Sequence, residues 1–162
     1  MASVKAGDNF LIPIGQKYCP GQIAGKYKQS LYVCIFDALV DDESGGSKAI
    51  SGMTPFIGAC TLDAFFFHGF WHVVDNTTVD RDVILTPVFK VEYNGRTYVE
   101  SFEGELLRPA TPEEVEFLRY RVVVAPVRVD KAVKAHFGDG PWEPAYENLR
   151  YSYAAESAGL TA

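Results

Sequence analysis

VFKVEYNGRTYVE, residues 88–100, is the clearest fold signal in the chain. Two runs within it, Val88–Tyr93 and Arg96–Glu100, alternate between apolar and polar side chains, as strands with one buried face do. Asn94-Gly95 separates the two runs, and this dipeptide readily adopts the two positive φ angles of a type I′ turn. The stretch therefore predicts an antiparallel β-hairpin with Gly95 at positive φ.

Short apolar runs on the N-terminal side of this hairpin predict further strands, because they are rich in β-branched and aromatic residues and are bounded by turn residues. They cover Phe10–Ile14, Tyr18–Ala24, Leu31–Phe36 and Phe56–Cys60. The aromatic stretch Phe65–Val74 is expected to form an interior strand or pair of strands, since alternation would leave both of its faces mainly apolar. Trp71 within it is expected in the core.

Helix signals lie on the C-terminal side. Thr111-Pro-Glu-Glu114 combines an N-cap Thr, a first-turn Pro and a capping-box Glu. Asp130 is expected to cap a second helix over 131–137, which Gly138 would end. Strands first and helices last predict an α+β, mostly β fold: a small curled antiparallel sheet or a partly open SH3-like barrel with two short helices in the C-terminal third. We expect one domain over 1–151 and a frayed tail over 152–162.

Composition narrows the classes of partner. The chain has 162 residues and a formal net charge of −6, and its Lys and Arg residues form no cluster, which argues against nucleic-acid binding. No apolar run approaches the roughly 20 residues that a membrane helix needs. The N-terminal residues lack the apolar core of a signal peptide, and the three cysteines are widely spaced. We therefore expect a cytoplasmic protein without a membrane span.

No local motif for catalysis, nucleotide binding or metal binding occurs in the sequence. His68 and His72 are the only candidate pair, and on a strand they would lie about 13 Å apart, too far for one metal ion. Cys34 and Cys60 lie in apolar segments and are expected to be inert core thiols. The expectation is a protein without a metal or cofactor that is not an enzyme, with an unrecognised enzyme site near His68 and His72 as an alternative.

The N-terminal stretch Gly7-Asp8-Asn9-Phe10-Leu11-Ile12-Pro13-Ile14, followed by Tyr18 and Gly21-Gln22-Ile23, resembles the immunity protein 26 family of bacterial polymorphic toxin systems. Trp71-His-Val-Val74 also looks like the family. Ile14 and Gln22-Ile23 depart mildly from its pattern, and the match is loose beyond Trp71. The resemblance implies a small, mostly β bacterial protein that binds and neutralises a cognate toxin without catalysis. The alternative is a small β-barrel adaptor that recognises a peptide or protein.

An acidic surface would suit a basic toxin, such as a nuclease-type domain, because opposite charge steers association. We therefore expect the toxin to contact three acidic segments, with Trp142 either an exposed anchor or a lid on the core. The acidic residues are Asp41, Asp42, Glu43, Asp75, Asp80, Asp82, Glu100, Glu103 and Glu105. The sequence leaves the oligomeric state, and the identity of any toxin, open.

Overall fold

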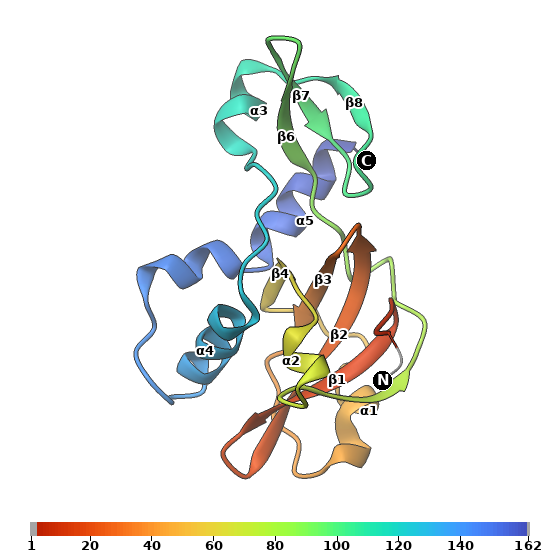
Figure 1. The fold of residues 1–162 in the computed structure, drawn as a ribbon, viewed down its shortest axis with the longest axis vertical. Coiled ribbons are helices and arrows are strands. Elements are labelled where there is room, and N and C mark those ends of the chain that lie inside the picture. The colour runs from red at the N-terminus through yellow and green to blue at the C-terminus, as the bar shows by residue number, and fades with distance from the viewer. Residues whose placement is uncertain (1–2, 162) are drawn as a thin grey trace. The chain divides into compact units, whose positions relative to one another are not determined.

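The computed structural model describes residues 3–161 and has the predicted α+β, mostly β fold (Figure 1). Its strands form two antiparallel sheets, of five and three strands, and neither sheet closes into a barrel. The chain divides into two compact units. The first unit runs to Ile84 and includes Val123–Tyr151, and the second comprises Leu85–Val122 and the residues from Ser152 onward. That 1–151 forms one domain stays a prediction.

The five-stranded sheet of the first unit has the order β4-β3-β2-β1-β5, with antiparallel neighbours throughout. Its strands are β1 (Asp8–Ile14), β2 (Lys17–Tyr27), β3 (Ser30–Ile35), β4 (Ile57–Thr61) and β5 (His72–Asn76). The first four confirm the strands predicted from the apolar runs. Tight turns join the first three, and positive φ angles at Gly15 and Lys28 make these turns possible.

Aromatic side chains dominate the core of the first unit. Trp71 is 1% exposed, which confirms its predicted place in the core, and it stacks on Phe10 with ring centroids 5.5 Å apart. Phe66 meets both rings edge-on, at 4.9 Å from Phe10 and 5.4 Å from Trp71. Edge-to-face and offset contacts of this kind add to the stabilisation from burial alone. Cys34 and Cys60 are buried as expected, and burial raises the pKa of the Cys34 thiol.

The prediction of a strand over Phe65–Val74 is wrong. Ala64–Phe67 form a single helical turn, α2, and β5 begins only at His72. The backbone carbonyl of Asp63 accepts hydrogen bonds from the N–H groups of Phe66 and Phe67, and Gly69 reverses the chain at a φ of 77°. On one strand, Phe66 and Trp71 would point to opposite faces. The helical turn instead places both in the same core.

Short helices complete the first unit: η1 (Glu43–Gly45), α1 (Gly46–Ala49), α4 (Pro126–His136) and η2 (Pro144–Leu149). The prediction that Asp130 caps a helix is wrong, because α4 begins one turn earlier, with a proline at its N-terminus. Asp130 is buried, accepts a hydrogen bond of 3.0 Å from the indole N–H of Trp71 and pairs with Lys134 at 2.8 Å. Gly138 follows α4 at a φ of 89°, as a helix stop does.

The second unit contains the predicted hairpin. Strands β6 (Phe89–Tyr93) and β7 (Arg96–Glu100) flank Asn94 and Gly95, whose φ angles of 48° and 77° are those of a type I′ turn. Strand β8 (Leu106–Pro109) adds to β7, giving the order β6-β7-β8. The capping box at Thr111 and Glu114 is also confirmed, at the start of α3 (Pro112–Phe117).

The predicted fraying of 152–162 is wrong for the residues that the structure describes. Ser152–Ala158 form α5 and Gly159–Thr161 form η3; Ala162 lies outside the described residues. Tyr153 and Ser157 are buried, and the hydroxyl of Tyr153 donates a hydrogen bond of 2.7 Å to the carbonyl of Val88. This bond joins residues 65 positions apart, so short-range sequence patterns do not reveal it.

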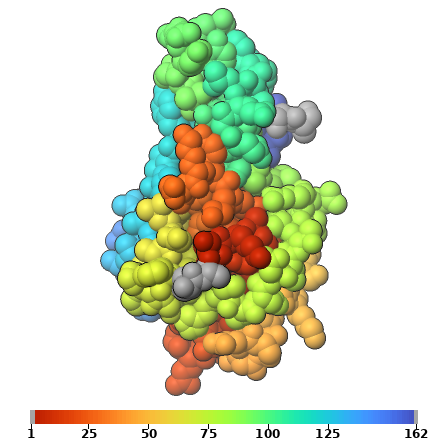
Figure 2. Space-filling model, turned by 45° about the vertical axis from the view of Figure 1, so that its right-hand side comes forward, coloured from red at the N-terminus to blue at the C-terminus, as the bar shows by residue number. Residues whose placement is uncertain are grey.

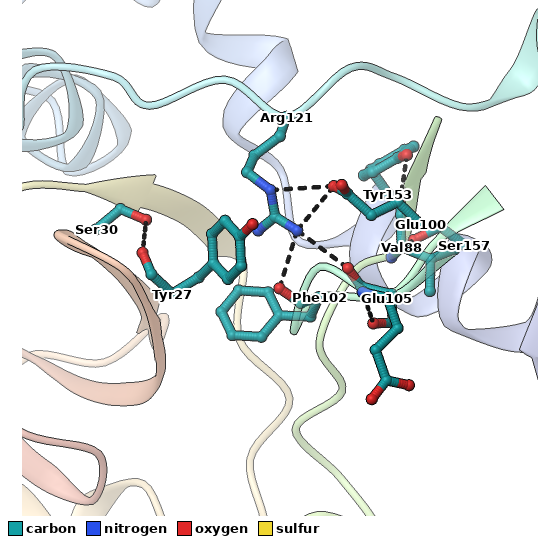
Figure 3. A network of polar contacts seen from close by, with 10 residues as sticks. Tyr27, Ser30, Val88, Glu100, Phe102, Glu105, Arg121, Tyr153 and Ser157 are labelled. Carbon is teal, nitrogen blue, oxygen red and sulfur yellow. Dashed lines mark hydrogen bonds and ion pairs between the residues drawn. The ribbon is translucent and has the colours of Figure 1, made fainter. Parts of the chain in front are cut away.

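A partly buried arginine, Arg121, contacts several residues of the second unit (Figure 3). The guanidinium of Arg121 donates to the carboxylate of Glu100 at 3.0 Å and to the carbonyl oxygens of Ser101 and Phe102 at 3.0 and 2.9 Å. It also lies over the ring of Phe89, 4.4 Å from the centroid. Arginine suits such a site because its planar group can donate several hydrogen bonds and stack at once.

Candidate partner-binding surface

The most exposed large apolar side chains of the first unit that the structure describes belong to two aromatic residues beside α2. Phe67 is 65% exposed and Phe70 is 57% exposed. We call this pair the aromatic knob. Figure 2 shows the region around α2, in yellow, open on the surface of the first unit. Single exposed apolar residues are common, but neighbouring exposed aromatics are typical of contact sites.

The chain beneath the knob is firmly held. The ring of Phe70 rests on that of Phe65 at 4.9 Å, and Phe65 meets Trp71 at 5.4 Å. Phe66 and Trp71 on either side are buried, and Asp130 fixes the indole of Trp71. A partner that covered the knob would therefore order little backbone, and low ordering cost favours binding.

Strand β5 follows the knob directly and forms one edge of the five-stranded sheet. It pairs with β1 over Asp8–Leu11, with a register shift at Asn9/Phe10, and no other strand among residues 3–161 pairs with it. Val73 within it is 44% exposed. An unpaired edge offers backbone N–H and C=O groups that another strand can bind.

The sequence around the knob is acidic. Residues 49–80 contain no Lys or Arg and include Asp63, Asp75 and Asp80. Asp63 and Asp80 are exposed, and Asp75, also exposed, accepts a hydrogen bond of 2.8 Å from the buried side chain of Asn9. Glu43 lies 3.6 Å from the Nδ1 atom of His72, at the start of β5. These exposed carboxylates would favour a partner of positive charge.

Of the remaining predicted acids of the first unit, Asp41 and Asp42 have local partners for their carboxylates. Asp42 caps η1 by accepting from the backbone and hydroxyl of Ser44, and these hydrogen bonds hold the pKa of its carboxyl below the usual value. Asp41 lies 3.6 Å from Lys17. Asp82 is exposed, and its backbone N–H donates to the carboxylate of Asp80. All of these side chains are accessible to a partner.

The predicted acids of the third segment belong to the second unit. Glu100 is committed to Arg121, and its side chain is only 14% exposed, so it is poorly placed to meet a partner. Glu103 and Glu105 are exposed. The nine acidic residues are therefore shared between two units, and those around the knob lie in the first.

Trp142 is less exposed than the knob. Its side chain is half-buried against the core of the first unit, and its indole N–H donates to Glu147 at 2.9 Å. The guanidinium of Arg150 lies 4.6 Å from its ring centroid. These contacts are those of a lid. Sequence reasoning placed Phe67 and Phe70 in an interior strand and so missed them; Gly69, whose φ of 77° ends the helical turn between them, was the signal against a continuous strand.

The two histidines near α2 differ in their surroundings. His68 is exposed, and His72 contacts the carbonyl of Gly69 through Nε2 at 2.8 Å. Within residues 3–161, no group of three or more His, Cys, Asp or Glu side chains could hold a metal ion. A pocket of about 510 Å³ lies elsewhere in the first unit, between α4 and η2, and neither histidine lines it. Its lining includes Asp130, Lys134, Asp139, Glu143 and Tyr146.

Among residues 3–161, no helix has both the length and the apolar character needed to cross a bilayer. Comparison of the chain with protein-family models, with curated proteins and with solved structures found no match.

Proposed function

We propose that this protein is a non-catalytic bacterial immunity protein that binds and neutralises a cognate toxin. The observation that carries the proposal is the aromatic knob, the exposed Phe67 and Phe70, of which Phe70 rests on the partly buried Phe65, within a stretch of chain that has carboxylates but no Lys or Arg. The resemblance of the N-terminal stretch to immunity proteins supports the class of partner. Cytoplasmic location is part of the same proposal.

The chemistry of the knob suits a stoichiometric inhibitor. Full burial of a Phe side chain contributes about 1.5–3 kcal/mol, so two such rings can supply much of the binding energy of a contact site. The surrounding carboxylates would speed the approach of a basic domain. A toxin that attacks nucleic acid needs a basic surface for its substrate, and an acidic inhibitor can cover that surface.

The alternative, an adaptor that recognises a peptide or protein, is supported by the open edge of β5. The sheets are not closed into a barrel, which removes the barrel from that hypothesis. The open edge of β5 remains a feature that peptide-binding modules use. A harmless signalling partner would favour the adaptor, whereas a toxic partner favours the immunity protein.

A photo-crosslinking residue in place of Phe70 tests the proposal directly. The same residue in place of Tyr93, an aromatic that is 54% exposed in the second unit, is the matched control. After irradiation in the native cells, we expect position 70 to capture a protein that position 93 does not. That protein, expressed alone, should arrest bacterial growth, and co-expression of this chain should restore it.

The double variant Phe67→Ser/Phe70→Ser should fail to restore growth, while Tyr93→Ser should restore it as the wild type does. A captured protein that has no effect on growth would overturn the toxin assignment. Equal protection by the double variant would overturn the role of the knob.

A further inference from the structure

The two edge strands of the five-stranded sheet differ in whether another part of the chain covers them. At β4, the chain returns and covers the edge: the N–H of Val124 donates to the carbonyl of Cys60 at 2.9 Å, and Thr61 donates its hydroxyl to the carbonyl of Val124 at 2.7 Å. At β5, no backbone hydrogen bond beyond the pairing with β1 involves residues 72–76 in the part of the chain that the structure describes.

The open edge also lacks two common forms of protection, although a register shift at Asn9/Phe10 interrupts its pairing with β1. Natural edge strands are often guarded by Lys or Pro residues, which discourage pairing with other strands. His72–Asn76 contain neither, and Val73 and Val74 favour extended structure. Asp75 is the one carboxylate in the strand, and it is hydrogen-bonded to Asn9.

We propose that the partner binds by adding an extended, basic segment to β5 as a sixth strand of the sheet. This inference rests on the proposed function, since it names how the partner of the same surface would bind. Main-chain hydrogen bonds to β5 would provide the pairing, and the neighbouring knob would provide apolar contacts. Because β5 has five residues, a segment of about 16 Å would cover it.

The charged residues near β5 indicate which kind of segment would bind there. Residues 49–80 carry three carboxylates and no Lys or Arg, with Lys48 and Arg81 at either end of the stretch, and Glu43 stands beside His72. Alternating Lys or Arg residues in the added strand would face this acidic surface, since opposite charges in neighbouring strands stabilise pairing. A second copy of this chain would bring like charges together at the same edge, so we assign the edge to a basic partner segment.

The probe for this inference is a synthetic capped peptide, acetyl-Val-Lys-Val-Lys-Val-Lys-amide. Its matched control has the same sequence with alternate backbone nitrogens methylated, which keeps the charge and the side chains but removes strand pairing. We expect the plain peptide to shift the amide NMR signals of 72–76, to leave those of 57–61 unchanged, and to slow hydrogen exchange in β5 at least about tenfold at saturation. The methylated peptide should produce neither effect.

Substitution at Val73 provides the second arm. Val73→Lys places a cation at the edge and should weaken peptide binding about tenfold, whereas Val73→Thr keeps β-propensity without charge and should change it less than about threefold. Both variants should fold, because the side chain is 44% exposed.

Three outcomes would overturn strand addition: no shift in β5 at millimolar peptide, equal shifts with the methylated peptide, or concentration-dependent shifts in β5 without any peptide, which would assign the edge to a second copy. Each of these leaves the crosslinking and growth tests of the immunity function untouched. Conversely, crosslinking at position 70 could fail while the peptide pairs specifically with β5. That result would support β5 as a binding site and contradict the proposed binding of a toxin.

Discussion

The two units of this protein hold together in different ways. The first has a large apolar core, in which Phe10, Phe66 and Trp71 meet at centroid distances between 4.9 and 5.5 Å. The second contains a smaller apolar cluster of Val88, Val99 and Leu118 and two hydrogen-bonded arginines, Arg108 and Arg121. Small folding units bury a lower share of their surface, so polar contacts decide more of their stability. Mutations in the first unit should therefore change stability mainly through packing, and mutations in the second mainly through charge and hydrogen bonding.

Truncation of the central tryptophan should produce the largest effect. Trp71→Ala removes a buried ring from contact with Phe10 and Phe66 and leaves the carboxylate of Asp130 without its indole donor. We expect a loss of about 3–5 kcal/mol in the free energy of unfolding, measured by chemical denaturation. Trp142→Ala, which removes a half-buried lid, is the control and should cost clearly less. Equal losses would show that the aromatic cluster is not the centre of the core.

Removal of the organising arginine should come next. Arg121→Met keeps much of the side-chain volume but leaves Glu100 and the carbonyls of Ser101 and Phe102 without this donor. We expect a loss of about 2–3 kcal/mol, because breaking a largely buried ion pair leaves an uncompensated charge. Hydrogen exchange should quicken in β7. The double variant Arg121→Met/Glu100→Gln should recover part of the loss; no recovery would mean that packing by the guanidinium, rather than its charge, stabilises the unit.

Acid should weaken the second unit to a smaller extent. Glu114 accepts from Arg108 at 2.6 Å and from the N–H of Thr111 at 2.9 Å, and these hydrogen bonds lower the pKa of its carboxyl to about 2. Because this pKa lies below that of an unfolded Glu, the stabilisation is complete above about pH 4.5 and is lost as the pH falls toward 2. The contribution should be about 1 kcal/mol, since the side chain of Arg108 is 41% exposed.

The measurement is hydrogen exchange in α3 across this pH range, with the known pH dependence of intrinsic exchange divided out. Glu114→Gln is the matched variant: it keeps a hydrogen-bond acceptor for the cap but cannot form the ion pair with Arg108. Its α3 should be less protected at pH 6 and should change less on acidification. An identical acid response in both proteins would assign the effect to other carboxylates.

The sequence predicted those elements whose causes are local. The hairpin at Asn94-Gly95 and the capping box at Thr111 both follow from residues a few positions apart, and both are confirmed. The aromatic stretch 65–74 was misread because each face of a strand would be equally apolar, and only the positions of Phe10 and Asp130 decide which rings turn inward. The helix α5 was missed for a related reason, since Tyr153 is fixed by the distant carbonyl of Val88.

The candidate surface was predicted only in part. Acidic character around Asp75 and Asp80 could be read from the sequence, because the exposure of charged residues is a reliable expectation. That Glu100 pairs with Arg121 could not, since the partner is 21 positions away. The prediction of a strand over 65–74 also hid the knob: Phe67 and Phe70 are apolar, and their exposure depends on the helical turn that ends at Phe67 and on the chain reversal at Gly69.

Substitutions in the knob itself should have the smallest effect on stability. They test most directly whether Phe67 and Phe70 are separate from the apolar core of the first unit. Phe67→Ser/Phe70→Ser removes the two rings that are 65% and 57% exposed, so the free energy of unfolding should change by less than about 1 kcal/mol. Denaturation midpoints of this variant and of Phe66→Ser, whose ring is 4% exposed, should therefore differ widely although the residues are neighbours. Solubility should rise, because an exposed apolar contact site is lost. A large loss of stability in the double variant would show that these rings serve the core, and the binding role proposed for them would then have no separate support.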